Sequence, residues 1–132
     1  MTKAVIEAYF AAFNKGDTEA MLALLDTDIE HHVNEGGIRR GKLAFAEFCA
    51  HMNHAYKETL TDIVAFSNED GTRGAAEFVV NGQYLKTDPG LPEARGQKYV
   101  LPAGSFFSLR DGRITRVTTY YNLQDWIRQV SA

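Results

Sequence analysis

The stretch 28–34 (Asp-Ile-Glu-His-His-Val-Asn) places a histidine on the apolar side of an alternating pattern. In an extended chain, Ile29, His31 and Val33 share one face and the residues between them share the other. A face that carries isoleucine and valine is expected to be buried, and a buried imidazole needs a hydrogen-bond partner or a function. Because imidazole has an ordinary pKa of about 6.5, His31 is a candidate general base at neutral pH. The alternative, a core histidine hydrogen-bonded to a backbone carbonyl or to Asn34, stays open.

The other metal-binding or nucleophilic side chains of the chain form no convincing site. His32 is expected on the face opposite His31, so the adjacent pair cannot bind one metal ion. His51 and His54 are three residues apart but have no third ligand, which is typical of a solvated pair. Cys49, the one cysteine, falls on the apolar side of an expected helix and is read as a core residue. No phosphate-cradling glycine loop, dinucleotide fingerprint or Ser-His-Asp arrangement is present, so neither a metal nor a cofactor is expected.

Tyrosine supplies the second candidate group for chemistry. Tyr9 lies on the apolar stripe of the first expected helix, where its hydroxyl either finds a partner in the core or points at a ligand. Tyr120, Asn122 and Trp126 cluster where the last expected strand meets the final helix. These side chains either close a cavity or dock the helix, and docking is the simpler role for Trp126.

Three helices are expected around the histidine stretch. Residues 3–14 carry apolar side chains at i, i+3 and i+4, and Gly16 suits a left-handed cap. Asp17 is expected to cap a second helix, which ends before Asp28. A third helix follows Gly41, and its expected buried stripe is Leu43, Phe45, Phe48, Cys49, Met52 and Tyr56.

From residue 58 the apolar pattern changes to the period of two that is typical of strands. Four strands are expected at 58–67, 72–85, 98–110 and 113–122, after the short strands 29–34 and 38–40. Asn-Glu-Asp-Gly at 68–71 and Arg-Asp-Gly-Arg at 110–113 are hairpin turns. Residues 86–97 are irregular, either a lid over a cavity or a long connection, and 123–130 form a closing helix. Helices followed by consecutive strands predict an α+β fold with helices on one face of a curved antiparallel sheet.

Composition excludes several classes of function. The 132 residues suit one domain, and the net charge of −3 argues against a nucleic-acid binder. No apolar run approaches the roughly 20 residues needed to span a bilayer, so no membrane partner is expected. The first residues lack a long apolar stretch with a cleavage site, which favours a cytoplasmic protein. Strands 72–85 and 98–109 are apolar on both faces, and since the helices cover one face, a homodimer is expected to cover the other.

Several local motifs resemble the nuclear-transport-factor-2-like superfamily, in its ketosteroid-isomerase and SnoaL-like polyketide-cyclase branches. The similar segments are Tyr-Phe-Ala-Ala-Phe-Asn-Lys-Gly-Asp at 9–17, Met-Leu-Ala-Leu-Leu at 21–25, Arg-Gly-Lys at 40–42 with Phe-Ala-Glu-Phe at 45–48, and the hairpin at 106–114. The resemblance covers essentially the whole chain and implies a single domain over 1–132. It also implies a cone-shaped, mixed or antiparallel sheet wrapped around the N-terminal helices, with a cavity inside.

The resemblance also suggests roles for single residues. Tyr9 falls where the isomerases keep the tyrosine that donates to the developing oxyanion, and His31 where they keep the aspartate that moves the proton. Ser105 falls where they keep a protonated aspartate as the second oxyanion donor. Asn122 falls where the cyclases keep an acidic residue near the end of the last strand. Neither branch's carboxylate is therefore present.

These observations lead to two hypotheses about function. The first is a small cofactor-independent isomerase, cyclase or lyase that moves a proton on an apolar, carbonyl-bearing metabolite, with Tyr9 and His31 as catalytic residues. The second is a non-catalytic module that uses the same cavity to bind a small hydrophobic molecule or a partner. The residues expected to contact the bound molecule are Asn34, Ser105, Phe107, Tyr120, Asn122 and Trp126.

Overall fold

The computed structural model describes residues 1–34 and 36–132, and it contains four helices and six strands within them. The helices are α1 (Thr2–Lys15), α2 (Thr18–Ala23), α3 (Lys42–Ala55) and α4 (Leu123–Ser131). The strands are β1 (Leu25–His32), β2 (Ile38–Arg40), β3 (Tyr56–Ser67), β4 (Arg73–Tyr84), β5 (Lys98–Arg110) and β6 (Arg113–Tyr121). The element types and their order match the prediction from sequence, and the ends differ by a few residues.

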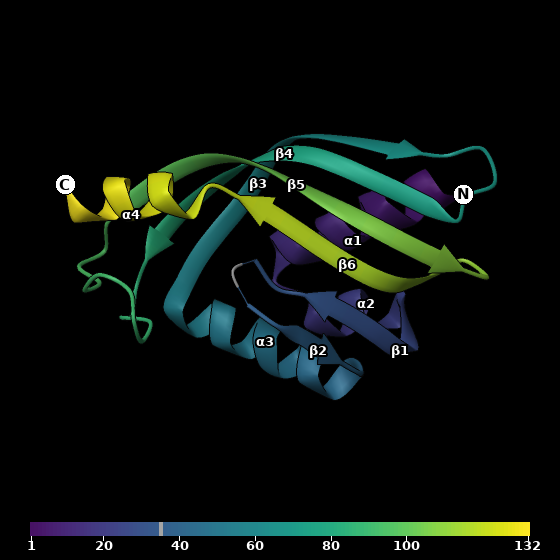
Figure 1. The fold of residues 1–132 in the computed structure, drawn as a ribbon, viewed down its shortest axis with the longest axis horizontal. Helices are drawn as coiled ribbons and strands as arrows, with labels where there is room; N and C mark the ends of the chain where they lie inside the picture. The colour runs from purple at the N-terminus through teal and green to yellow at the C-terminus, as the bar shows by residue number, and fades with distance from the viewer. Residues whose placement is uncertain (35) are drawn as a thin grey trace.

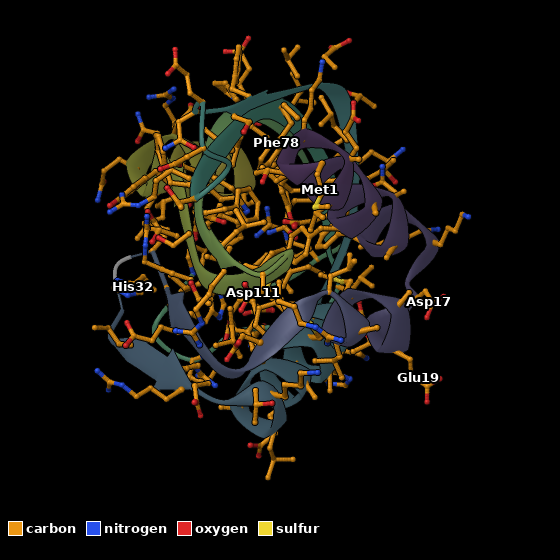
Figure 2. The ribbon with its side chains drawn as sticks, turned by 90° about the vertical axis from the view of Figure 1, so that its right-hand side faces the viewer. Met1, Asp17, Glu19, His32, Phe78 and Asp111 are labelled. Atoms are coloured by element: carbon orange, nitrogen blue, oxygen red, sulfur yellow. The ribbon has the colours of Figure 1, made fainter. Side chains whose placement is uncertain are left out.

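All six strands belong to one curled sheet in the order β2-β1-β6-β5-β4-β3. The pairs are antiparallel except for β1 and β6, which run parallel with His31 opposite Val117. Figure 1 shows α1 and α3 on one side of the sheet, and α4 at the end of the molecule opposite the N-terminus. Seen end on, the sheet curls around a packed interior without closing (Figure 2). The expected α+β fold with helices inside a curved sheet is confirmed.

Local chemistry explains where the first helices end. Gly16 has φ 68°, the left-handed conformation that glycine adopts without strain, and its N–H bonds back to the last turn of α1. The carboxylate of Asp17 accepts the N–H of Ala20 at 3.1 Å and so caps α2. Both features were predicted from the sequence.

One part of the predicted α3 stripe is wrong. Phe45 and Cys49 are buried, but Leu43 is 77% exposed. Since an α-helix turns about 100° per residue, Leu43 lies about 200° around the helix from Phe45 and so faces away from the sheet. The buried face of α3 is narrower than the stripe that the sequence suggested.

The inner side of the sheet carries the core, which aromatic rings dominate. At one end, the ring of Phe10 lies 4.9 Å from that of Phe78 and 5.9 Å from that of Phe107. At the other end, Trp126 docks α4 against the rings of Tyr84 and Tyr99, at 4.9 and 5.8 Å. Aromatic packing therefore fills both ends of the interior.

Residues 85–97 connect β4 to β5 and are tied to the fold at Asp88. The Asp88 carboxylate accepts the hydroxyl of Tyr56 at 2.7 Å and lies 3.1 Å from Nε2 of His51 on α3. The hydroxyl of Tyr84 accepts the backbone N–H of Asp88 and donates to the carbonyl of Pro92. These bonds hold the connection against the end of the sheet.

Candidate functional site

His31 lies on the inner face of β1, only 6% exposed, as the alternation predicted. The rings of Phe45 and Phe48 on α3 pack against it, with centroids at 5.1 and 4.5 Å. Its Nδ1 has no hydrogen-bond partner among the described residues. A buried polar atom without a partner costs about 1–3 kcal/mol, so such an atom needs an explanation.

The surroundings of His31 favour its neutral form. Burial among phenylalanine rings is the main cause, and the positive charges of Arg39 and His32 add to it, so that the pKa of His31 falls to about 4. The guanidinium of Arg39 lies 5.7 Å from the centre of the Phe48 ring that contacts His31. At neutral pH the imidazole is therefore uncharged, and one of its nitrogens can accept a proton or a hydrogen bond.

Tyr9 lies on the inner side of α1 and is 7% exposed. Its ring meets the edges of Phe10, Phe45 and Phe107 at 5.2, 6.4 and 5.5 Å. Burial, with a smaller contribution from Cys49, raises the pKa of the Tyr9 hydroxyl well above its usual value, which keeps this group a hydrogen-bond donor. None of the hydrogen bonds among the described residues involves that hydroxyl.

Tyr9 and His31 come together at Phe45. The tyrosine approaches this ring from α1 and the histidine from β1, while Phe45 itself belongs to α3. Two buried polar side chains without observed protein partners thus contact one aromatic ring. An apolar setting of this kind strengthens any hydrogen bond that a bound molecule makes there.

Two of the predicted contact residues are engaged with the protein itself. The Ser105 hydroxyl is 2.7 Å from that of Thr119 on the neighbouring strand and is 1% exposed. Phe107 is fully buried against Tyr9 and Phe10. Both residues lie on the inner face of β5, the face towards Tyr9. Ser105 presents a hydroxyl that is already hydrogen-bonded, and Phe107 forms an apolar wall beside Tyr9.

Asn34, predicted to contact the bound molecule, lies beyond the end of β1. The residue follows β1, and its side-chain nitrogen has no hydrogen-bond partner among the described residues. A hydrogen bond between His31 and Asn34, one of the two alternatives that the sequence left open, is not formed among the described residues. The reason is the alternation itself, since Asn34 lines a cavity beside His32, which faces away from His31.

The last three predicted residues do not meet Tyr9. Tyr120 is 58% exposed, and its ring contacts Phe106 at 5.8 Å on the outer face of the sheet. The side-chain oxygen of Asn122 accepts the N–H of Asp125 at 3.0 Å and so caps α4. Trp126 is buried in the docking contact of α4, at the other end of the interior from Phe107.

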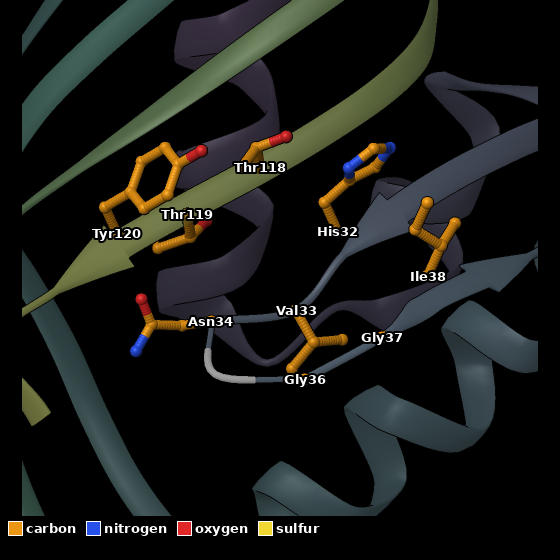
Figure 3. A pocket seen from close by; sticks show the side chains of 9 residues that line it. All are labelled: His32, Val33, Asn34, Gly36, Gly37, Ile38, Thr118, Thr119 and Tyr120. Atoms are coloured by element: carbon orange, nitrogen blue, oxygen red, sulfur yellow. The ribbon is translucent and has the colours of Figure 1, made fainter.

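A cavity of about 340 Å³ lies between the end of β1, the turn before β2 and strand β6. Figure 3 shows His32, Thr118 and Tyr120 on one side of it and Val33 and Asn34 on the other. Neither Tyr9 nor His31 lines this cavity, and His32 and Tyr120 reach it from the outer side of the sheet. The predicted site residues therefore fall into an inner and an outer group.

Glu58 is the polar residue of the interior that the sequence interpretation missed. It lies on β3 between Tyr56 and the buried Leu60, and its Oε2 accepts the hydroxyl of Tyr99 at 2.5 Å. Burial raises the pKa of the Glu58 carboxyl, and the bond from Tyr99 offsets part of this effect. The signal was present in the sequence, because a glutamate two residues before a core leucine shares its face in a strand.

Two kinds of feature are absent from the described residues. Within residues 1–34 and 36–132, no group of three or more histidine, cysteine, aspartate or glutamate side chains is placed to bind a metal ion. None of the helices in this part of the chain combines the length and the apolar character needed to cross a membrane.

Comparison with known proteins identifies the family. The model of the SnoaL-like domain matches residues 6–117. No curated protein matches the chain. A crystal structure from Silicibacter sp. TM1040, provisionally assigned as a polyketide cyclase, is 68% identical in sequence, with 99% of this chain and 96% of that chain covered and a TM-score of 0.97.

Two other solved structures carry the same provisional assignment. The protein from Pseudomonas putida KT2440 is 55% identical, with 98% of each chain covered and a TM-score of 0.97. The protein from Xanthomonas campestris pv. campestris is also 55% identical, with 98% of this chain and 96% of that chain covered and a TM-score of 0.94. The chain therefore belongs to the SnoaL-like domain family, and its fold is nuclear-transport-factor-2-like.

Proposed function

We propose that the protein is a small cofactor-independent enzyme, of isomerase or cyclase type, that moves a proton on an apolar metabolite with a carbonyl group. The observation that carries this proposal is the meeting of two buried polar side chains at Phe45, with no partner for Nδ1 of His31 among the described residues. The similarity to proteins provisionally assigned as polyketide cyclases, which would act on carbonyl compounds, supports the same class of substrate.

In the proposed reaction, Tyr9 donates a hydrogen bond to the carbonyl oxygen of the substrate. Neutral His31 removes a proton from the carbon next to that carbonyl, the C–H electron pair forms the carbon–carbon double bond of an enolate, and the negative charge moves to the oxygen. The imidazolium then returns the proton to the same or another carbon. Because His31 is a weak base in the free protein, the developing enolate beside it must stabilise its protonated form.

We expect Tyr9→Phe and His31→Gln each to lower the rate of proton transfer by roughly 10²-fold or more, as the loss of an oxyanion donor or a general base does. The measurement is NMR-detected deuterium uptake from D₂O into an enolisable ketone such as 2-tetralone. His32→Gln is the matched control, because the neighbouring histidine faces the opposite side and bonds to Glu30 at 3.2 Å. This control should exchange the ketone as fast as the unmodified protein.

The alternative function is a binding module that uses the same space without chemistry. It predicts that ketones bind but take up no deuterium above the uncatalysed rate. It also predicts that Tyr9→Phe and His31→Gln change stability by about 1–3 kcal/mol and leave the exchange rate unaltered. That result would contradict the catalytic proposal.

We also propose that the protein forms a homodimer through the outer face of the sheet. Helices α1 and α3 pack on the inner face of the sheet (Figure 1). The outer face exposes apolar side chains from three strands. These side chains are Phe66 on β3, Val100 and Phe106 on β5, and Tyr120 on β6. Phe66 and Phe106 both lie opposite Ala75 in the pairing of the strands, so they form a continuous apolar row.

Phe106→Glu is expected to convert the protein to a monomer. The substitution would bury a charge without a partner at the centre of the proposed interface, which is strongly unfavourable. Sedimentation should give twice 14.7 kDa for the unmodified protein and 14.7 kDa for the variant. Leu43→Glu, at an exposed apolar position on α3 away from the outer face of the sheet, is the control and should remain dimeric. An unmodified protein that sediments at 14.7 kDa at micromolar concentration would rule out the dimer.

A further inference from the structure

Arg39 lies beside His31 on the neighbouring strand. The Cα atoms of these two residues are partners in the antiparallel pair of β1 and β2, so their side chains leave the sheet on the same face. The Arg39 guanidinium is 5.7 Å from the centre of the Phe48 ring, and that ring is 4.5 Å from the ring of His31. The elements that carry the three residues, β1, β2 and α3, lie side by side (Figure 1). A positive charge thus stands close to the proposed base, and both groups contact Phe48.

The guanidinium of Arg39 has no acidic partner among the described residues. Its neighbour Arg40 differs, because it lies on the opposite face of β2 and its Nε is 3.8 Å from Oε2 of Glu30. None of the ion pairs or side-chain hydrogen bonds within residues 1–34 and 36–132 involves the Arg39 guanidinium. A guanidinium over an aromatic ring keeps the N–H groups at its edge free to donate.

The three side chains differ in their exposure to water. Arg39 is exposed, Phe48 is half-buried and His31 is buried. A charged group that binds at Arg39 would stay in contact with water and so avoid most of the cost of desolvation. The apolar part of the same molecule could lie along Phe48 towards His31. The arrangement therefore suits an elongated molecule that carries a charge at one end only.

The geometry of the guanidinium indicates which charged group fits best. Its N–H groups form a planar edge that can donate two parallel hydrogen bonds, and the two oxygens of a carboxylate match this edge. One carboxylate also balances the single positive charge of Arg39. We therefore expect a carboxylate at this position.

A carboxylate at Arg39 would also affect His31. Burial is the largest cause of the low pKa of His31, and the positive charge of Arg39 is the second. A negative charge beside the guanidinium opposes this second effect. The imidazole would thus become a stronger base when an anionic substrate is in place.

We propose that the substrate of the proton-transfer reaction is a carbonyl compound with a carboxylate at its far end, and that Arg39 binds this carboxylate while the carbonyl end reaches Tyr9 and His31. This inference rests on the proposed function and narrows its substrates from carbonyl compounds in general to oxo acids. Arg39 selects the substrate in this scheme and takes no part in moving the proton.

The first test compares 4-benzoylbutanoate with its methyl ester. The two compounds share one enolisable ketone, and only the acid carries a charge. Deuterium uptake next to the ketone is followed by NMR, and each rate is divided by the uncatalysed rate. For the unmodified protein we expect kcat/KM to be about 10-fold or more higher for the acid, as charge-assisted hydrogen bonds contribute.

Three substitutions show whether Arg39 causes this preference. Arg39→Gln removes the charge and should abolish the preference for the acid. Arg39→Lys retains the charge but not the planar pair of donors, so it should restore part of the preference. Arg40→Gln is the matched control, because it removes the same charge from the opposite face of β2 and should retain the full preference. Thermal unfolding shows whether each variant is folded.

The second test requires no reaction. 4-Phenylbutanoate and its methyl ester lack the ketone, and their binding is followed by the ring signals of His31 in NMR spectra of protein labelled with ¹³C-histidine. The spectrum of His31→Gln identifies these signals among those of the 4 histidines. The acid should bind at least about 10-fold more tightly than the ester to the unmodified protein. Arg39→Gln should bind the two equally.

The inference is overturned if 4-phenylbutanoate binds no more tightly than its ester, or if a folded Arg39→Gln variant keeps the preference. A response of His31 to inorganic phosphate but not to 4-phenylbutanoate would overturn it too, because Arg39 would then bind anions without the apolar part. If the preference depends on Arg39 but neither ketone takes up deuterium, the anion site stands and the proton-transfer function fails. If both ketones exchange at equal rates, the function stands and the role of Arg39 fails.

Discussion

Replacing Gly82 with alanine is expected to lower the free energy of unfolding by about 3 kcal/mol. A Cβ atom at this position of β4 would lie 2.2 Å from Cζ of Tyr99 and 2.5 Å from its hydroxyl oxygen. Tyr99 cannot move aside easily, because it is buried and is held by Glu58 and Trp126. Overpacking of a core costs about 1–3 kcal/mol, and a displaced hydroxyl would add the cost of leaving the Glu58 carboxyl without its partner.

Gly104→Ala is the matched control for this experiment. Gly104 also lies within a long strand of the sheet, but a Cβ there would be 3.5 Å from the nearest atom, the carbonyl oxygen of Ala76. This is an ordinary contact, so we expect a change within about 1 kcal/mol, in either direction. Denaturant unfolding at one protein concentration measures both variants. Equal losses of stability in Gly82→Ala and Gly104→Ala would show that the nearby Tyr99 ring is not the reason why position 82 needs a glycine.

Acidification from pH 7 to pH 4 is expected to remove about 3 kcal/mol of stability through His31 alone. The pKa of this side chain is about 4 in the folded protein, against 6.5 as its ordinary value. Between these two values the unfolded chain binds a proton that the folded protein excludes, so protonation favours unfolding. The contribution of His31 is therefore complete above about pH 6.5 and is lost as the pH falls towards 4.

The experiment compares how stability depends on pH in different variants. His31→Gln should unfold with a weaker pH dependence over this range, whatever its stability at neutral pH, because no imidazole remains to be protonated. His54→Gln, which alters an exposed histidine of α3, should retain the pH dependence of the unmodified protein. Asp26 and Asp70 have lowered pKa values and lose their contributions in more acidic solution. Parallel curves for His31→Gln and the unmodified protein would contradict the prediction.

Local patterns were sufficient to predict most of the fold. The alternation around His31 indicated correctly that the side chain is buried, and Gly16 and Asp17 marked the end of α1 and the start of α2. Each of these signals depends on neighbours in the sequence, which is why it could be interpreted without the structure. The burial of Leu43 was predicted wrongly, since the apolar pattern does not show how much of a helix the sheet covers.

The composition of the site depended on contacts that no local pattern encodes. The meeting of Tyr9 and His31 at Phe45 joins three elements, and only the resemblance to a family suggested that the first two lie together. Glu58 could have been noticed from its place in β3, but its partner Tyr99 is 41 residues away. The exposed position of Tyr120 follows from the register of β5 and β6, which the sequence alone does not reveal.

The parallel pairing of β1 with β6 affects how the protein folds during its synthesis on the ribosome. During synthesis β1 leaves the ribosome early, yet its neighbour β6 is made only after β3, β4 and β5. Until then one edge of β1, including the backbone beside His31, can pair only with water or with a wrong strand. In the nascent chain, one edge of β1 therefore stays unpaired while the later hairpins form. Completion of the sheet is then a slow, late step of folding. The unpaired edge is a segment that chaperones can bind in the meantime.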